Sequence, residues 1–239
     1  MTRQAAIAGD YMRGFQPPWS LDSRRAALVV VDMQYATGAR AHGLGAMRNA
    51  AEPGSYLDYR FTRIETVVIP AVQALLSASR RVAMPVIYLV LGSDRADCGD
   101  LVPHLRAFTA AVGNRVGSPV HRILDEITPQ AGDMVLRKTT VGGFASTDIG
   151  EVLRRQERDQ IVMCGISTSY CVDQTAREAA DRGFRVLVVD DAVAENEQSW
   201  HDQSLFLFER AFGRVSTSPK VIAELARGTP LIEPERPGP

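Results

Sequence analysis

One stretch, residues 160–183, constrains the fold more than any other part of the chain. Residues 161–166 read Ile-Val-Met-Cys-Gly-Ile without polar alternation, a pattern typical of a strand that is buried on both faces of a parallel sheet. From Cys171 onward, small residues recur at helical spacing until Gly183 provides a natural stop. A strand, a turn and a helix in this order predict an α/β fold.

Cys171 stands at the junction between this strand and this helix. A thiol in the first turn of a helix lies near unpaired backbone N–H groups and the positive end of the helix dipole, so we expect its thiolate to be favoured. Most free cysteines are small core residues, and Cys164, in mid-strand, fits that interpretation. Cys171 differs because open α/β sheets bind their ligands at such junctions. It is therefore a candidate nucleophile.

The rest of the chain alternates in the same way. Apolar runs predict further strands at 26–32, 82–91, 133–138, 184–190 and 214–216. Helical spacing predicts helices at 62–80, 146–155, 199–212 and 219–227. Residues 38–59 are expected to form a long loop, and residues 92–130 a loop with a short helix. This order predicts one doubly wound α/β domain over residues 25–228, with an N-terminal arm at 1–24 and a flexible Pro-rich tail at 229–239.

Composition restricts the partners that we expect. The 239 residues are 45% hydrophobic and 23% charged, with a net charge of -1, so nothing predicts nucleic acid or a membrane surface as a partner. Three cysteines without framework spacing indicate a reducing compartment. We find no apolar stretch suited to span a membrane and no signal peptide, and expect a cytoplasmic protein. The arm, with Pro17, Pro18 and Trp19, suggests a homo-oligomer, either a dimer or a tetramer.

Three side chains with chemical potential follow three predicted strands. Asp32, Lys138 and Cys171 each end or follow an apolar run, so a parallel sheet would bring them to the same edge. Separately they have ordinary explanations, because a strand-ending aspartate is commonly a turn residue and a lysine there is commonly solvated. Together they supply a base, a cation and a nucleophile. The sequence therefore predicts a catalytic site at this edge.

These residues also carry a family resemblance. The motifs are Val-Val-Asp-Met-Gln at 30–34, Lys138 with Phe144 and Thr147 behind it, and Gly-Ile-Ser-Thr-Ser-Tyr-Cys-Val at 165–172. Over roughly residues 25–227 the chain resembles the isochorismatase-like cysteine hydrolases, which include N-carbamoylsarcosine, ureidoacrylate and biuret amidohydrolases. The resemblance implies three α/β/α layers around a six-stranded, Rossmann-like parallel sheet of order 3-2-1-4-5-6. Strands one and four are then neighbours, which places Asp32 beside Cys171.

The resemblance also implies a mechanism. Asp32 would take the thiol proton, Lys138 would hold the charges in place, and the thiolate of Cys171 would attack an amide or ureido carbonyl to give a thioester. Backbone N–H groups of Cys171 and Ser167 would form the oxyanion hole. The family has a cis peptide at the position that matches Ile166–Ser167. The small-molecule substrate is thus expected to be an amide, ureide or carbamoyl compound.

Departures from the family pattern narrow this expectation. Nicotinamidase-type relatives carry metal-binding histidines after the second strand, whereas residues 92–100 contain none; we expect neither a metal nor another cofactor. Isochorismatases proper lack the cysteine, so Cys171 favours C–N hydrolysis. Thr37 and Gly38 stand where many relatives place an aromatic residue. We therefore expect the substrate to contact Gln34, Tyr35, Phe144 and Tyr170, with residues 56–61 as further candidates.

Two other interpretations remain open at this stage. Cys171 could be a redox cysteine that cycles through sulfenic acid, although the sequence shows no resolving cysteine near it. The chain could also be a catalytically silent relative with a scaffold role, which an intact set of Asp32, Lys138 and Cys171 disfavours. The substrate itself is not predicted, because we expect specificity to reside in residues 38–61, residues 92–130 and the helix that begins near Ser199.

Overall fold

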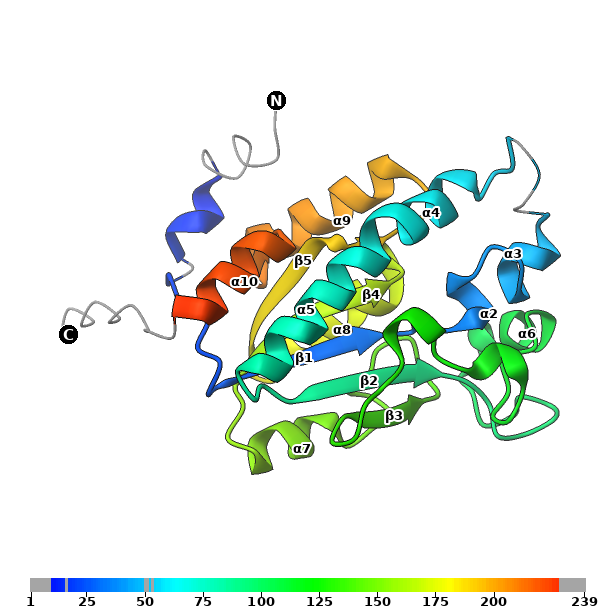
Figure 1. Ribbon diagram of the computed structural model, residues 1–239, viewed down its shortest axis with the longest axis horizontal. Coiled ribbons are helices and arrows are strands. Elements are labelled where there is room, and N and C mark those ends of the chain that lie inside the picture. The colour runs from blue at the N-terminus through cyan, green and yellow to red at the C-terminus, as the bar shows by residue number, and fades with distance from the viewer. Residues whose placement is uncertain (1–9, 16, 50–51, 53, 228–239) are drawn as a thin grey trace.

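The computed structural model describes residues 10–15, 17–49, 52 and 54–227, and its centre is a parallel sheet of order β3-β2-β1-β4-β5-β6 (Figure 1). The strands are β1 (Ala26–Val31), β2 (Val86–Leu91), β3 (Met134–Lys138), β4 (Gln160–Ile166), β5 (Arg185–Ala194) and β6 (Arg214–Ser216). All five strand pairs are parallel. The predicted fold class and strand order are confirmed.

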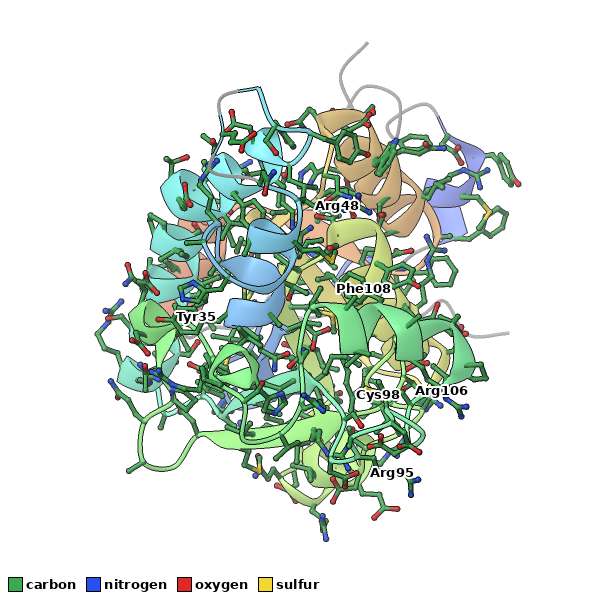
Figure 2. All side chains as sticks on the ribbon, turned by 90° about the vertical axis from the view of Figure 1, so that its right-hand side faces the viewer. Tyr35, Arg48, Arg95, Cys98, Arg106 and Phe108 are labelled. Carbon is green, nitrogen blue, oxygen red and sulfur yellow. The ribbon has the colours of Figure 1, made fainter. Side chains whose placement is uncertain are left out.

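Helices cover both faces of the sheet. The helices are α2 (Tyr35–Gly38), α3 (Gly43–Met47), α4 (Asp58–Arg63), α5 (Ile69–Arg81), α6 (Pro103–Ala111), α7 (Ile149–Arg155), α8 (Asp173–Asp181), α9 (Gln198–Ala211) and α10 (Ser218–Arg227). Helices α4, α5 and α10 contribute to one core cluster, and α7, α8 and α9 to the other. Helices α2, α3 and α6 lie beyond the carboxyl ends of the strands (Figure 1), the end that faces the viewer in Figure 2.

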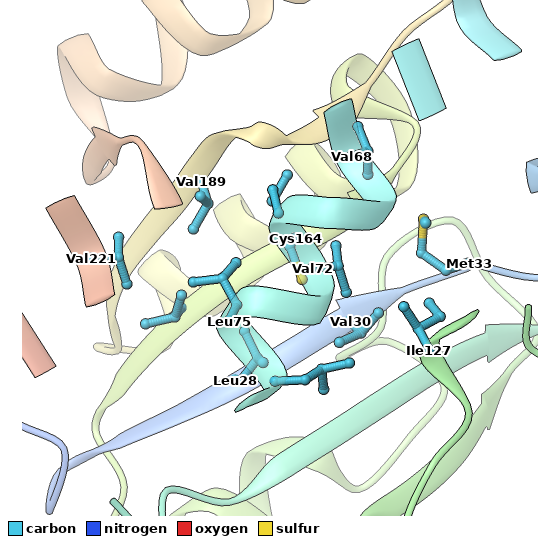
Figure 3. Close-up of a cluster of buried hydrophobic side chains, with 14 of the residues drawn as sticks. Leu28, Val30, Met33, Val68, Val72, Leu75, Ile127, Cys164, Val189 and Val221 are labelled. Carbon is cyan, nitrogen blue, oxygen red and sulfur yellow. The ribbon is translucent and has the colours of Figure 1, made fainter. Parts of the chain in front are cut away.

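The pleat of β1 explains why its sequence shows no polar alternation. Leu28 and Val30 belong to the cluster under α5, whereas Ala27, Val29 and Val31 belong to the cluster on the opposite face. Figure 3 shows the first cluster, with Val72 and Leu75 of α5 packed over β1 and near Cys164 of β4. Fully burying an aliphatic side chain stabilises the fold by about 1.5–3 kcal/mol. Both faces of this strand therefore hold the three layers together.

The helical segment Asp58–Arg81 corrects one expectation from the sequence. It runs through α4, a π-helical turn at Ile64–Val68 and α5, and its 24 residues are long and apolar enough to cross a membrane by length and composition. The sequence analysis placed the helix at 62–80 and expected no such stretch. Its apolar side chains, including Phe61, Ile64 and Val68, are buried in the core under the sheet. A core helix meets the same criteria for this reason.

Several element boundaries differ from those predicted. Strand β2 begins at Val86, because residues 82–84 still form the turn that leaves α5, with Ala83 at a φ of 51°. Strand β5 continues to Ala194, where it pairs with Ile166 after a shift in register. The predicted loop at 38–59 contains α3, whereas α6 is the short helix that was expected within residues 92–130. The predicted tail at 229–239 lies outside the described residues, as do residues 1–9 of the arm.

Candidate active site

Asp32 stands directly after β1 in a backbone conformation that few residue types tolerate. Its φ is 51°, in the left-handed region that aspartate enters more readily than most residues. The side chain is 4% exposed, and its Oδ1 accepts a hydrogen bond of 2.8 Å from the N–H of Leu91 at the end of β2. The carboxylate is thus held between two strand ends, with Oδ2 left to face the site.

Lys138, the last residue of β3, lies beneath the site with no exposed surface. Its Nζ is 2.8 Å from Oδ2 of Asp32 and donates to Sγ of Cys171 at 3.4 Å. It also donates to the carbonyl oxygens of Thr140 at 3.1 Å and Val141 at 2.9 Å. Burial on its own would lower the pKa of Lys138, but Asp32 and Cys171 outweigh burial, so the pKa is raised. The ammonium therefore stays charged.

Cys171 reaches the same point from β4. The chain leaves β4 through a cis peptide between Ile166 and Ser167, as the family resemblance implies, and then forms a π-helical turn, η5 (Thr168–Val172). Helix α8 begins only at Asp173. The expectation that the helix starts at Cys171 was therefore wrong by two residues, because a wider turn precedes it. Asp32, Lys138 and Cys171, which we call the floor, are brought together as predicted from the strand ends.

The electrostatics of the floor correct the expected thiolate. Burial raises the pKa of the Cys171 thiol to about 12; the positive charge of Lys138 opposes this rise, and the carboxylate of Asp32 adds to it. The dipole at a helix N-terminus cannot offset the loss of water around the sulfur. The resting cysteine is therefore a thiol, and a nucleophilic role requires that a base remove its proton.

Gly165 allows this close approach of β4 to β1. Its φ is +118°, and a Cβ at this position would lie 2.1 Å from the carbonyl oxygen of Val31. Val31 precedes Asp32, so any displacement here would move the carboxylate relative to the turn that carries Cys171. Glycine is required by the backbone conformation and by the contact, and it supports the geometry of the floor.

A pocket of about 800 Å³ opens above Asp32 and Cys171. Its walls include the polar residues Ser167, Asn196 and Glu195 and the aliphatic residues Leu44, Leu57 and Leu105. Four aromatic side chains, which we call the mouth, also line it: Tyr56, Phe108, Tyr170 and Trp200. Figure 2 looks onto this end of the molecule, with Arg48 and Phe108 on the side toward the viewer. The segments 38–61 and 92–130 and helix α9, in which we expected specificity, all contribute to the walls.

Three of the four expected substrate contacts do not line this pocket. The Gln34 side chain is buried and donates to the carbonyl oxygen of His121 at 2.7 Å. Tyr35 packs edge-on against His42 and under Arg122, to one side in Figure 2. Phe144 packs against Phe184 in the core. Only Tyr170, which is 49% exposed, reaches the pocket. Proximity in sequence to Asp32 or Lys138 gave no information on side-chain direction.

The sequence analysis missed two buried charged residues in the pocket wall. Arg60, on α4, is 2% exposed and donates to Oγ of Ser167 at 2.7 Å and to the carbonyl oxygen of Thr37 at 3.1 Å. Glu195, just after β5, is 4% exposed and accepts from the N–H and Oγ of Ser169 at 2.9 and 2.6 Å. The sequence of α4, Asp-Tyr-Arg-Phe-Thr-Arg, hid the arginine, since charged residues on a helix ordinarily indicate its solvated face.

The titratable side chains do not form a metal site in the described part of the chain. Within residues 10–15, 17–49, 52 and 54–227, no group of three or more His, Cys, Asp or Glu side chains is placed to hold a metal ion. His121 bonds Gln34 and Asn114, and His201 bonds Asp190 and Thr168. Both ring nitrogens of His201 are thus hydrogen-bonded, whereas the two contacts of His121 share Nδ1.

Comparison with known proteins identifies the family. A family model for the isochorismatase domain matches residues 26–220. The fold is similar to that of a cysteine hydrolase from Pseudomonas syringae pv. phaseolicola 1448A, at 24% identity and a TM-score of 0.70, with 89% of this chain and 98% of that chain covered.

Two further solved structures share the fold. An N-carbamoylsarcosine amidase from Thermoplasma acidophilum is 29% identical, with a TM-score of 0.61 and coverage of 81% of this chain and 96% of that one. A nicotinamidase/pyrazinamidase from Bacillus subtilis is 22% identical, with a TM-score of 0.63 and coverage of 80% and 99%. The domain match spans most of the chain and the sheet order agrees. This chain therefore belongs to the isochorismatase family of hydrolases.

Proposed function

We propose that this hydrolase cleaves the C–N bond of a small amide, ureido or carbamoyl compound through a thioester on Cys171, without a metal. One observation carries the proposal. Nζ of Lys138 lies 2.8 Å from the carboxylate of Asp32 and 3.4 Å from the sulfur of Cys171, so a base, a cation and a nucleophile meet at the floor of a pocket. The name of the N-carbamoylsarcosine amidase, at 29% identity, supports the same bond type.

The first chemical step follows from the raised pKa of the thiol. Asp32 takes the proton from Sγ as the sulfur attacks the carbonyl carbon, and the C=O electrons move to oxygen. Lys138 stays protonated and faces both groups, so it stabilises the negative charge as it passes from the carboxylate to the sulfur. A thiol that ionises only during attack avoids an isolated thiolate in a buried site.

The oxyanion and the leaving group require two further contributions. Backbone N–H groups of Ser167 and Cys171 are the proposed donors to the oxyanion, since Ser167 is the N-cap residue of η5, Cys171 lies within η5, and both residues line the pocket. As the tetrahedral intermediate collapses, the C–N bond breaks and the leaving amine or ammonia takes the proton from Asp32. Water then attacks the thioester, with Asp32 again as base, and releases the acid and the thiol.

A substrate panel tests this proposal. Purified protein is incubated with ureides, N-carbamoyl amino acids and primary amides, and ammonia release is measured against Cys171→Ser, whose hydroxyl is far harder to deprotonate. Wild type should release ammonia from at least one class, and the variant should release none above background. A folded wild-type protein that releases no ammonia from any class at millimolar substrate would refute the proposal.

A further inference from the structure

The four aromatic side chains of the mouth are exposed to solvent. Tyr56 is 64% exposed, Phe108 36%, Tyr170 49% and Trp200 42%. They come from the segment before α4, from α6, from η5 and from α9, so the fold gathers them from four separate parts of the chain. Clustered exposed apolar surface in a soluble domain commonly marks a binding site. Here the cluster is continuous with the cavity that contains Cys171.

The lining of the pocket combines polar and apolar surface. Asp32, Ser167 and Glu195 line it, and so do aliphatic residues such as Leu44 and Leu105 and the aromatic mouth. A cavity of about 800 Å³ far exceeds the space that an amide group needs, and pockets of roughly 300–1,000 Å³ hold whole organic ligands. We propose that the substrate carries an aromatic or similarly flat apolar group beside its amide, and that the mouth covers this group. The inference rests on the proposed function.

Paired substrates test the inference. Phenylacetamide and acetamide present the same primary amide, and burial of the phenyl ring should raise kcat/KM by roughly 10²-fold. Trp200→Ala and Phe108→Ala should each lower kcat/KM for phenylacetamide about tenfold and so reduce the ratio of kcat/KM for phenylacetamide to that for acetamide. Leu207→Ala is the matched control, because Leu207 is 43% exposed on the same helix as Trp200 but does not line the pocket. Equal kcat/KM for both amides would overturn the inference.

Binding provides a readout that does not depend on turnover. The chain contains two tryptophans, Trp19 and Trp200, and only Trp200 lines the pocket. Phenylacetamide should change the fluorescence of Cys171→Ala saturably, with no change when Trp200→Phe is added. If phenylacetamide binds but no amide is hydrolysed, the proposed function fails, and with it the assignment of an aromatic amide as substrate, although the mouth is shown to bind an aromatic ring. The mouth would instead be a subunit interface if its variants turned an oligomer into monomers and left the phenylacetamide preference intact.

A separate observation concerns Arg60. Its guanidinium joins three segments of the pocket wall, through Oγ of Ser167 at 2.7 Å, Oδ1 of Asn196 at 3.3 Å and the carbonyl oxygen of Thr37 at 3.1 Å. Its Nε is buried and has no hydrogen-bond partner among the described residues. Burial lowers the pKa of Arg60, while Glu195 and Cys171 act in the opposite direction; the group remains charged at neutral pH.

A buried, incompletely bonded cation costs folding free energy, which favours a functional explanation. The geometry points to Arg60 as a positioning residue that holds Ser167, the proposed oxyanion donor. The two terminal nitrogens of its guanidinium donate to protein acceptors, so it acts through Ser167. This inference also rests on the proposed function.

Arg63 offers a matched control on the same helix. It is largely buried and donates to the carbonyl oxygens of Val193 at 3.0 Å and Asp190 at 2.9 Å, but it does not line the pocket. Arg60→Met should lower kcat about 10²-fold with KM within threefold, because loss of an oxyanion contribution acts on the transition state. Arg63→Met should lower Tm and leave kcat within threefold.

A second pair of variants keeps the test valid if Arg60→Met does not fold. Arg60→Lys keeps the charge but not the fork of donors, so iodoacetamide alkylation of Cys171 should keep its pH profile while kcat falls. Ser167→Ala removes the acceptor but leaves the backbone N–H, and it should have little additional effect in the Arg60→Lys protein. Arg60→Lys with wild-type kcat, or additive losses in the double variant, would overturn the role. Failure of the proposed function would instead remove turnover from the wild type.

Discussion

The floor and the mouth of the pocket are built from different kinds of structure. Asp32 and Lys138 lie at the ends of β1 and β3, and Cys171 lies in the turn that follows β4, so the register of one parallel sheet sets their separation. The mouth comes from segments between or beyond the strands, and its residues are exposed by 36–64%. The proposed chemistry thus uses buried residues at the strand ends, and the proposed recognition uses exposed residues of the connecting segments.

This difference implies different tolerances to change. The buried pair Asp32–Lys138 is strongly coupled, and removal of one partner from such a pair typically destabilises a protein by about 3–5 kcal/mol. Exposed residues of the mouth can be replaced at small cost in stability, since most surface substitutions lie within about 0.5 kcal/mol. Variants of the floor should therefore change reaction rate and stability together, whereas variants of the mouth should change substrate preference alone.

The largest expected effect is at Cys171. Cys171→Ala removes the nucleophile, so amide turnover should fall to background while the protein still folds, because alanine fills the site without a new charge. Circular dichroism and ammonia release measure the two properties. The control is Cys164→Ala, which removes a fully buried thiol from the core beneath α5 and should lower Tm but spare kcat. Near-normal turnover in Cys171→Ala would exclude covalent catalysis at this residue.

Asp32→Asn should have the next largest effect. The amide oxygen can still accept from the N–H of Leu91, but the base is lost, so kcat should fall by about 10²–10⁴-fold. The variant also removes a negative charge and a hydrogen-bond acceptor that both raise the pKa of Cys171. Alkylation of the thiol should consequently move to lower pH even as turnover falls. Wild-type turnover in this variant would assign the proton transfer to another group.

The floor was predictable from the sequence, whereas the mouth was predictable only in part, for a physical reason. Tyr170 and the segment that contains Tyr56 were expected at the pocket, but Phe108 and Trp200 were not named. An apolar strand that ends in a polar residue has a known direction in a parallel sheet, so Asp32 and Lys138 could be assigned to the same edge before the fold was known. The family resemblance supplied the strand order and the oxyanion turn. By contrast, Phe108 and Trp200 belong to ordinary helical patterns, and nothing local indicates that α6 and α9 approach the same cavity.

The sequence also did not predict the electrostatic environment of the site. The position of Cys171 near a helix start predicted a low pKa, but the pKa depends on burial by residues distant in the chain. Arg60 shows the same limit, because an arginine on an amphipathic helix carries no sign that it is buried against Ser167. Tyr35 and Phe144 failed as pocket residues because side-chain direction depends on packing. Local pattern predicts elements and strand ends, and long-range packing determines the rest.

Lys138→Met tests the floor with a smaller and more selective change. Lys138 lowers the pKa of Cys171, whereas burial and Asp32 raise it, so loss of the ammonium should move the alkylation profile of the thiol to higher pH. In wild type the profile should already lie above neutral pH, because the thiol pKa is raised to about 12. Asp32→Asn and Lys138→Met should therefore shift the profile in opposite directions. A shift in the same direction for both would mean that altered burial, rather than charge, controls the thiol.

Metal chelation should have the smallest effect, because we expect it to leave turnover unchanged. It tests whether a metal ion adds a positive charge to the floor. His104 and His121 lie in the segment 92–130, and His121 is already bonded to Gln34 and Asn114. The positive charge beside the reacting sulfur comes from Lys138 at 3.4 Å, so the proposed chemistry requires no metal. Turnover after dialysis against EDTA should remain within experimental error of the untreated enzyme. Loss of turnover that zinc or manganese restores would show that a metal site contributes to the floor, and the division between the two regions would have to be redrawn.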